Sequence, residues 1–135
     1  MPDAGGATVS VPGALDGYLA LHEKFGSMEL KDLLEPAAKH AEEGYAVSLK
    51  VSKAWSWGAS KLERFSPTAD VYLPGGKAPV AGQIFVQPDL AATWRKVGRE
   101  GRAAFYAGDI RDRILEVLSK NGGFLEAGDF KPVQA

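Results

Sequence analysis

The side chains that most often carry catalysis or bind metals are sparse in this sequence. His22 and His40 are its only histidines, and a zinc-binding protease helix needs two histidines one turn apart with a glutamate beside the first. The phrases HE and HAEE do not supply that spacing, so we expect no metal site. His40, near the C-terminal end of a predicted helix, is explained by a favourable interaction with the helix dipole.

Nucleophiles and carboxylates give no stronger signal. The chain has no cysteine, which excludes a thiol nucleophile, a disulfide and a zinc-thiolate site, and no serine lies in a GxSxG elbow. The phrase LPGGKAP lacks the spacing of a phosphate-binding loop and predicts a turn at Gly75 and Gly76. Glu42 and Glu43 are interpreted as a solvated helix end, because a catalytic pair requires carboxylates that face one another. Chemistry alone predicts no catalytic residue.

The stretch WRKVGREGRAAFYAGDIRDRILEVL, residues 94–118, interleaves basic side chains with aromatics, as a surface that tracks phosphates and stacks on bases does. Acidic residues lie among the basic ones, however, and the predicted helices place both on polar faces. The whole chain has net charge −1, whereas nucleic-acid modules are usually basic. We expect solvated helix faces of mixed sign and no nucleic-acid partner, with an anionic ligand or partner as the alternative. Phe105 and Tyr106 are interpreted as packing residues at a helix junction.

Length and composition fit one globular domain or a piece of one. The chain has 135 residues, of which 45% are hydrophobic and 24% charged, close to the averages of globular proteins. The opening MPDAGGATVS lacks the basic and apolar regions of a secretory signal, and no run approaches the roughly 18 apolar residues of a membrane span. The sequence predicts a soluble chain without a membrane span and does not itself indicate a location.

Hydrophobic spacing and turn residues predict a mainly helical chain with at most trivial strand. Gly26, Gly44 and Gly101 are expected to end helices, and Ser48 to cap one by offering its hydroxyl to free backbone donors. Pro36 is expected to divide one helical stretch in two, because the residue before a proline is pushed out of the helical region. The predicted helices are about 12–25, 28–34, 36–43, 49–65, 88–100 and 109–120, and the phrase RAAFYAG, residues 102–108, is expected to form a short turn between the last two.

Further expectations concern packing. Residues 66–87 hold several glycines and prolines without a sustained period, which predicts an irregular segment within a single partial domain spanning 1–135. His22 falls on the apolar face of its helix, the side that should be buried. The side chains expected to be substantially buried are Leu15, Leu19, Phe25, Leu33, Leu34, Leu90, Trp94, Ile110, Ile114 and Leu118.

Several phrases, taken together, resemble the γ-glutamyltransferase (γ-glutamyltranspeptidase) family. They are VSVPGALDGYLALHEKFGSMELKDLLEPAAKHAEEGYAVS and, later, GQIFVQPDLAATWRKVGREGRAAFYAGDIRDRILEVLSKNGGFLEAGDF. The family typically shows a VPG before a helix that ends in Phe-Gly, then a Leu-x-x-Pro-Ala segment and an Ala-Glu-x-Gly helix end. It continues with a Gln-Pro-x-Leu-Ala-x-Thr phrase, a Phe-Tyr-x-Gly turn and a Gly-Gly before an acidic residue. All occur here in order, so nearly the whole chain is similar to an internal part of the large subunit.

The resemblance implies a fold and an activity. Enzymes of this family are N-terminal nucleophile hydrolases with an αββα core, made as a zymogen that cleaves itself into large and small subunits. The N-terminal threonine of the small subunit attacks the γ-glutamyl amide of glutathione-like substrates, and the acyl group passes to water or an amino acid. The implied partners are the rest of the large subunit, the small subunit and the substrate, and no cofactor is implied. Thr93 lies inside a helix phrase and is not that nucleophile.

The residues that carry the family's chemistry are not found in this sequence. Its nucleophile phrase, a threonine followed two residues on by a histidine, is missing. The Arg-Glu-x-Ala-Pro phrase that holds the substrate carboxylate is missing too, and the oxyanion-hole glycines belong to the small subunit. The resemblance therefore assigns no catalytic, substrate-binding or metal residue, and neither Arg102 nor Arg111 is given the carboxylate role. We expect a fragment, a truncated reading frame or a degenerate homologue that is inactive alone.

Two alternative functions remain open at this point. The first is a related N-terminal nucleophile acylase that acts on a different amide. The second is a non-enzymatic helical interaction module, with Trp55, Trp57, Phe105 and Tyr106 as partner anchors. Many bacterial members of the resembled family are periplasmic or extracellular, and the resemblance implies that location.

Overall fold

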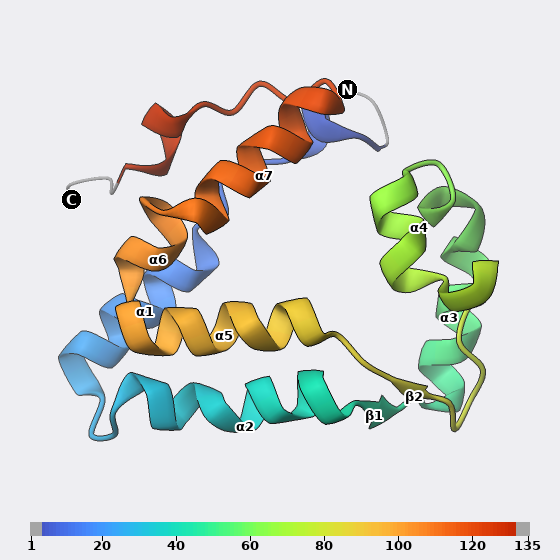
Figure 1. Cartoon of the computed structure of the whole chain (residues 1–135), viewed down its shortest axis with the longest axis horizontal. Helices are drawn as coiled ribbons and strands as arrows, with labels where there is room; N and C mark the ends of the chain where they lie inside the picture. Colours follow the sequence, from blue (N-terminus) through green and yellow to red (C-terminus); the bar gives the residue numbers. More distant parts are fainter. Residues whose placement is uncertain (1–3, 132–135) are drawn as a thin grey trace. The chain divides into compact units, whose positions relative to one another are not determined.

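A computed structural model describes residues 4–131 of the chain, and these residues are mainly helical (Figure 1). The predicted fold class is confirmed, and none of the helices in the described part is long and apolar enough to cross a membrane. Contacts divide the chain into two compact units, each described by itself below. The α-helices are α1 Ala14–Phe25, α2 Leu30–Glu43, α3 Leu49–Leu62, α4 Ser66–Tyr72, α5 Pro88–Glu100, α6 Arg102–Tyr106 and α7 Asp109–Lys120.

Unit 1 comprises the described residues of 1–36 and 93–135. It holds α1, the first half of α2, the second half of α5, α6 and α7, together with the short 3-10 turns η1 Gly6–Thr8 and η3 Ala127–Phe130. Gly6 donates its N–H to the Asn121 carbonyl at 3.0 Å, and a side chain at Gly6 would meet the Gly123 nitrogen at 2.6 Å. This close approach fastens η1 to the end of α7. The buried hydrophobic residues of the unit are Leu19, Val97, Ala104, Tyr106, Leu118 and Phe130.

Unit 2 is Ala37–Ala92. It holds the end of α2, α3, α4, the 3-10 turn η2 Pro74–Gly76, the strands β1 Tyr45–Ala46 and β2 Ile84–Phe85, and the start of α5. The strands form an antiparallel pair in which Tyr45 lies opposite Phe85 and Ala46 opposite Ile84. Two strands of two residues each agree with the prediction of trivial strand. The buried hydrophobic residues are Ala38, Ala41, Val47, Leu73, Phe85 and Ala91.

Three predictions of secondary structure are wrong. Residues 66–87 are not irregular throughout, because they contain α4, η2 and β2. Pro67 near the first position of α4 suits a helix start, since its missing N–H costs nothing there. Residues 102–106 form α6 rather than a turn, and α2 runs through Pro36 as one helix. Ala38 and Ala41 on the second half of α2 are buried, and this packing favours the continuous helix. It outweighs the preference of Glu35, the residue before the proline, for an extended conformation. The single partial domain spanning 1–135 stays a prediction.

The predicted core is only partly buried. Leu19 and Leu118 are buried as expected, whereas Phe25, Leu33 and Leu90 are 71%, 49% and 37% exposed and were wrongly placed in the core. Helical spacing identifies the apolar face of a helix but not whether another element covers it. For this reason the burial prediction was wrong for these three residues. The other five expected core residues, Leu15, Leu34, Trp94, Ile110 and Ile114, are half-buried.

Candidate functional site

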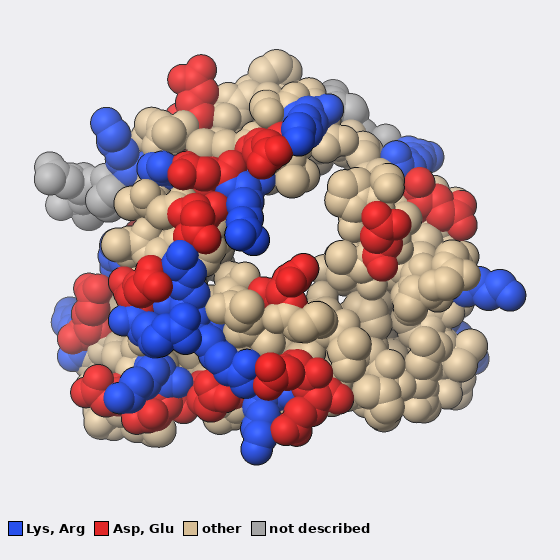
Figure 2. All heavy atoms as spheres, in the orientation of Figure 1, with Lys and Arg blue, Asp and Glu red and all other residues tan. Residues whose placement is uncertain are grey.

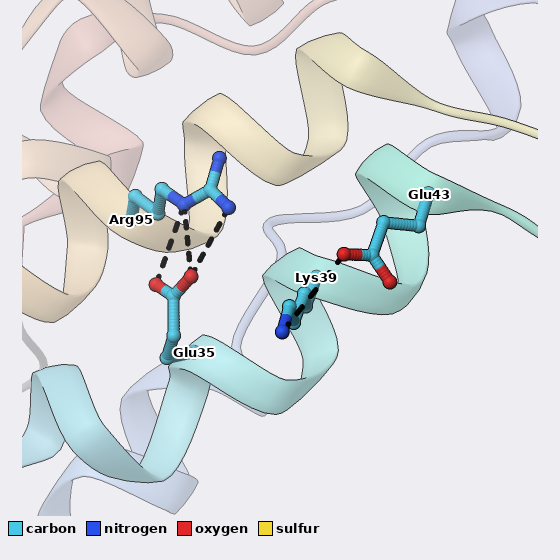
Figure 3. A network of polar contacts seen from close by, with 4 residues as sticks. All are labelled: Glu35, Lys39, Glu43 and Arg95. Atoms are coloured by element: carbon cyan, nitrogen blue, oxygen red, sulfur yellow. Dashed lines mark hydrogen bonds and ion pairs between the residues drawn. The ribbon is translucent and has the colours of Figure 1, made fainter.

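The basic side chain of Arg95 on α5 faces an acidic partner within unit 1. Its guanidinium donates from Nε and Nη2 to the Glu35 carboxylate on α2, at 3.1–3.3 Å (Figure 3). The Arg95 side chain is 28% exposed and that of Glu35 is 50% exposed. An ion pair this open to water contributes about 1 kcal/mol at most. Arg95 therefore fastens the first half of α2 to α5.

The basic residues of α5 and α7 in unit 1 also have acidic neighbours. Lys96 donates to the Asp109 carboxylate at the start of α7, and this hydrogen bond lowers the pKa of Asp109. Arg111 donates to the adjacent Asp112 at 2.7–2.9 Å. Figure 2 shows Lys and Arg side chains intermingled with Asp and Glu side chains on this part of the surface. The predicted mixed sign of these helix faces is confirmed.

The Tyr106 hydroxyl at the end of α6 joins two backbone groups at the start of α1. It donates to the Pro12 carbonyl at 2.6 Å and accepts from the Asp16 N–H at 2.9 Å. The N-cap residue of α1 is Gly13, which has no side chain to cap the helix. Tyr106 therefore satisfies the backbone donor that an N-cap side chain normally serves. Burial raises the pKa of Tyr106, and the charge of Arg102 acts in the opposite direction.

Arg102 strengthens the same contact between α6 and α1. Its guanidinium pairs with the carboxylates of Asp16 and Glu23, the second at 3.4 Å. The Arg102 side chain is 30% exposed, and those of its partners are 40% and 67% exposed. Since Arg102 neutralises two carboxylates of α1, its role in unit 1 is structural. The structure gives no support for assigning it to a substrate carboxylate.

Two hollows of unit 1 lie beside the Tyr106 contact. One, of about 180 Å³, is lined by Asp16, Tyr106, Asp129 and Lys131 together with apolar and backbone atoms. The other, of about 440 Å³, also includes Tyr106 and Lys131 and adds Arg111. Charges of both signs face these hollows, but their linings contain no histidine, serine or threonine. They therefore contain none of the Ser, Thr or Cys side chains that usually form an acyl-enzyme.

Unit 2 contains a hollow of about 380 Å³. The backbone and side chains of residues 83–90 form one side of it, and α4 contributes Asp70 and Val71. Its apolar lining includes Ile84, Phe85 and Leu90. Hollows of this size and character receive apolar groups of a ligand or of another polypeptide segment. Its carboxylates and amides offer hydrogen bonds, and its lining contains no serine, threonine, cysteine or histidine.

The histidines, glutamates and glycines considered in the sequence analysis each have a separate local environment. His22 is half-buried with its Nε2 2.8 Å from the Met28 carbonyl, and His40 is exposed. Glu43 pairs with Lys39 one turn earlier on α2, at 3.9 Å, with both side chains about two-thirds exposed (Figure 3). Gly75 and Gly76 form the expected turn with φ of 67° and 75°. Within residues 4–131, no three His, Cys, Asp or Glu side chains gather as a metal site would require.

The four aromatic residues considered as partner anchors have different environments. In unit 2 the Trp55 ring packs against Phe85 and Tyr72, with centroids 4.8 and 6.0 Å apart. In unit 1 Tyr106 is buried, and Phe105 is half-buried against it at 5.0 Å. Trp57 alone of the four is exposed, to 83%. The packing role predicted for Phe105 and Tyr106 is confirmed.

The sequence predicts a packing role for Tyr106 but not the two hydrogen bonds of its hydroxyl. The two groups that this hydroxyl contacts lie 90 and 94 positions earlier in the chain. No local spacing can reveal such a contact. The only sequence signal is indirect: Gly13 at the start of α1 leaves the helix without a side-chain cap.

Comparison with known proteins identifies relatives across the whole chain. The family described as Gamma-glutamyltranspeptidase matches residues 1–135. The glutathione hydrolase-like YwrD proenzyme of Bacillus subtilis is 37% identical over 93% of this chain and 24% of its own length. The acylase ACY 1 proenzyme of a Pseudomonas strain is 34% identical over 93% of this chain and 22% of its own length. The chain thus spans about a quarter of the length of these curated relatives.

Solved structures give the same result. The γ-glutamyltranspeptidase of Helicobacter pylori superposes with a TM-score of 0.91 at 30% identity, over 95% of this chain and 37% of that one. A cephalosporin acylase from Bacillus halodurans superposes with a TM-score of 0.90 at 30% identity, over 96% of this chain and 25% of that one. The helical arrangement is that of N-terminal nucleophile hydrolases, and the chain corresponds to part of the large subunit. The chain belongs to the γ-glutamyltranspeptidase family.

Proposed function

We propose that this chain is a scaffold segment of an enzyme that hydrolyses or transfers γ-glutamyl groups of glutathione-like substrates. The family match over residues 1–135 carries the proposal. It is supported by one relative named a glutathione hydrolase-like proenzyme, at 37% identity, and one named a glutathione hydrolase proenzyme, at 32% identity. The chemistry would proceed through an N-terminal threonine nucleophile that this chain does not contain. Its amine would act as base, and the acyl group would pass to water or to an amino acid.

Within that enzyme, the described helices would position the catalytic centre rather than take part in it. The described hollows of both units have no serine, threonine or cysteine in their linings. Polar contacts of Tyr106 and Arg95 hold helices of unit 1 together. The partners of the scaffold would be the rest of the large subunit and the small subunit, and the relatives' designation as proenzymes supports processing of a common precursor.

A related acylase is the second candidate, because two comparisons favour it. An acylase ACY 1 proenzyme is 34% identical to this chain, and a cephalosporin acylase structure superposes almost as well as the transpeptidase does. The scaffold is therefore shared by enzymes of both names. The two activities differ in the acyl group that is recognised: γ-glutamyl carries an α-amino and an α-carboxylate group, whereas a simple aliphatic acyl group does not.

A pair of assays tests the proposed function. The chain 1–135 alone should release no 4-nitroaniline from γ-glutamyl-4-nitroanilide above an empty-vector preparation. A processed protein that joins this segment to the remaining parts of the family's fold should cleave that anilide much faster than a glutaryl anilide, which lacks the α-amino group. Faster cleavage of the glutaryl anilide would assign the protein to the acylases. Turnover by the chain alone would show that the scaffold assignment is wrong.

A third candidate, an independent interaction module, predicts a different physical behaviour. A scaffold separated from its neighbours should expose apolar side chains on several elements, and such surface promotes association and dye binding. Tyr18, Leu21 and Phe25 of α1 are 58–71% exposed, and in unit 2 Leu49 and Ile84 are 62% and 57% exposed. We therefore expect chain 1–135 to bind a hydrophobic dye and to self-associate in sedimentation. A compact monomer with cooperative melting and no dye binding would instead favour the module.

A further inference from the structure

Asn121 follows the last residue of α7 in unit 1 and precedes Gly122. It is the only asparagine of the chain, and asparagine is one of the thermolabile residue types. Its side-chain amide carbon, Cγ, can be attacked by the backbone nitrogen of the next residue, and the lack of a Cβ makes glycine the least hindered residue in that position. Asn121 and Gly122 are both exposed. The Asn121–Gly122 pair therefore has the groups needed for an intramolecular reaction.

The attacking atom of this reaction is the backbone nitrogen of Gly122. The N–H groups on either side of it, those of Asn121 and Gly123, both donate to the Leu118 carbonyl, at 3.0 and 2.7 Å. The Gly122 N–H, by contrast, donates to no backbone carbonyl of residues 4–131. A nitrogen that is already hydrogen-bonded must first give up its acceptor before it can react, and the Gly122 nitrogen does not have to give up a backbone acceptor in the described part of the chain.

The folded chain holds the Asn121–Gly122 pair in an unreactive conformation. Asn121 Nδ2 donates to the Val117 carbonyl at 2.7 Å, and the Asn121 carbonyl accepts from the Gly6 N–H at 3.0 Å. The Asn121 ψ of 24° turns the Gly122 nitrogen away from Cγ. Attack therefore requires rotation of both the backbone and the side chain of Asn121, with loss of the two hydrogen bonds. Since each contributes about fivefold to the population of the closed form, the reactive conformation is roughly 30-fold rarer in the folded chain than in an unstructured one.

We propose that Asn121 is a site of spontaneous deamidation, at a rate set by the contact between η1 and the end of α7. The Gly122 nitrogen forms a bond to Asn121 Cγ, the bond from Cγ to Nδ2 breaks, and ammonia leaves with the proton of the Gly122 N–H. The product is a succinimide ring. Water then opens the ring: cleavage between the nitrogen and Cγ gives aspartate, and cleavage at the former Asn121 carbonyl gives isoaspartate. Water is the only co-reactant.

Asp16 and Gly17 form an internal comparison, because they too place a side-chain carbonyl carbon before a glycine. They lie in the first turn of α1, where the Gly17 N–H donates to the Gly13 carbonyl at 3.2 Å and the Asp16 carboxylate pairs with Arg102. Both reacting groups are thus engaged, and we expect no conversion at Asp16. The reaction at Asn121 involves adjacent groups and water, so it requires no partner and is independent of the proposed enzymatic activity.

Conversion of Asn121 would loosen the contact between η1 and α7. A carboxylate in place of the amide loses the donor to the Val117 carbonyl and adds a negative charge at the C-terminal end of a helix, where it is unfavourable. Isoaspartate also lengthens the backbone by one methylene, at a place where a Cβ on Gly6 would already meet the Gly123 nitrogen at 2.6 Å. The Gly6 N–H should then lose its acceptor, and its hydrogen exchange should accelerate about fivefold. Asn121→Asp should accelerate that exchange in the same direction.

The test is incubation of chain 1–135 at neutral and at mildly alkaline pH, followed by digestion and mass spectrometry. Cleavage after Glu116 and Glu126 yields peptide 117–126, which contains Asn121 and no glutamine. Exchange of its amide NH2 for OH raises the mass, and enzymatic methylation identifies isoaspartate. The rate should rise with hydroxide concentration, because the Gly122 nitrogen must lose its proton. It should be roughly 30-fold lower than in synthetic peptide 117–126 and than in the chain unfolded in urea.

Matched variants connect the rate to the contact between η1 and α7. Gly6→Ala should raise the rate at least fivefold, because its methyl cannot fit beside Gly123, whereas nothing lies within 4 Å of the methyl of Gly128→Ala, which should leave the rate unchanged. Circular dichroism shows whether Gly6→Ala keeps its helices, and the urea comparison tests the same restraint without a substitution. The proposal is overturned if folded and unfolded chains convert equally fast, if the folded chain stays unconverted at alkaline pH beyond the time that the 30-fold ratio predicts, or if Asp16 changes as fast as Asn121.

Discussion

Removal of one oxygen atom at Tyr106 should measurably loosen the start of α1. In Tyr106→Phe the aromatic ring can keep its place in the core of unit 1, where Tyr106 is 9% exposed. The change removes the donor to the Pro12 carbonyl at 2.6 Å and the acceptor of the Asp16 N–H at 2.9 Å. Because Gly13 has no side chain, no group of the N-cap residue can replace the hydroxyl.

The expected cost follows from the two lost hydrogen bonds. Loss of an N-cap acceptor costs about 1 kcal/mol, and loss of a second partly buried hydrogen bond costs about 1 kcal/mol more. Tyr106→Phe should therefore lower the free energy of unfolding by about 2 kcal/mol. For a chain of this length that corresponds to a fall in Tm of roughly 8 °C. If the N-terminal turn of α1 opens locally, exchange of the Asp16 amide hydrogen should accelerate about 30-fold.

Thermal unfolding and amide hydrogen exchange measure these two effects. Tyr18→Phe on α1 is the matched control, since Tyr18 is 68% exposed and should change stability by less than about 0.5 kcal/mol. A cost for Tyr106→Phe no greater than that of the control would refute the capping role. A cost of the expected size without faster exchange at Asp16 would also refute it, because the hydroxyl would then act elsewhere.

The titration of Tyr106 gives an independent check. Burial raises the pKa of Tyr106 above its usual value of 10.0. A raised pKa in the folded state means that the neutral hydroxyl contributes stability fully below about pH 10 and that this contribution is lost as the pH rises through the folded pKa. The difference in unfolding free energy between the natural protein and Tyr106→Phe should therefore be constant at neutral pH and shrink under alkaline conditions.

Three further substitutions test other parts of the fold. Gly44→Ala should destabilise by about 2–3 kcal/mol in chemical denaturation, because φ is 85° and the added methyl would lie 2.6 Å from Ile84. Gly58→Ala in the interior of α3, where nothing lies within 4 Å of the added methyl, should instead stabilise by about 0.5–1 kcal/mol. The hydrogen bond from Lys96 lowers the pKa of Asp109, so this carboxylate stabilises above its usual pKa and loses that effect as the pH falls through the lowered one. Asp109→Asn should remove that part of the acid dependence, and titration followed by NMR should show the Asp109 pKa rising toward its usual value at high salt.

Local features of the fold could be predicted because single residues determine them. Ser48 caps α3 as expected, its hydroxyl accepting from the Val51 N–H at 3.3 Å. Gly44 and Gly101 follow helices with φ of 85° and 65°, conformations that glycine adopts without a steric cost. Gly26 also ends its helix, but with φ of −68° rather than in a left-handed conformation. A glycine therefore marks the end of a helix more reliably than it fixes the geometry of that end.

Contacts between distant segments could not be predicted from spacing. Helical periodicity placed Phe25 and Leu33 on apolar faces, yet both are largely exposed, because a face is a property of one helix and burial depends on what covers it. The helix α2 continues through Pro36, although the local preference of the preceding residue opposes it. In each case the outcome depends on neighbours that a short sequence window does not contain.

The residues that carry the family resemblance explain why the scaffold could be recognised without a catalytic residue. The glycine of the helix-ending phrase AEEG is Gly44, where a side chain would collide with Ile84 and Val86. The glycine of the phrase FYAG is Gly108, where a side chain would lie 3.0 Å from the Ala104 carbonyl oxygen. These phrases therefore specify backbone packing, and the backbone arrangement is similar in the Helicobacter pylori γ-glutamyltranspeptidase and in the cephalosporin acylase. Packing of this kind identifies the family but does not select the acyl group, so the distinction between the two activities must depend on side chains that contact the substrate.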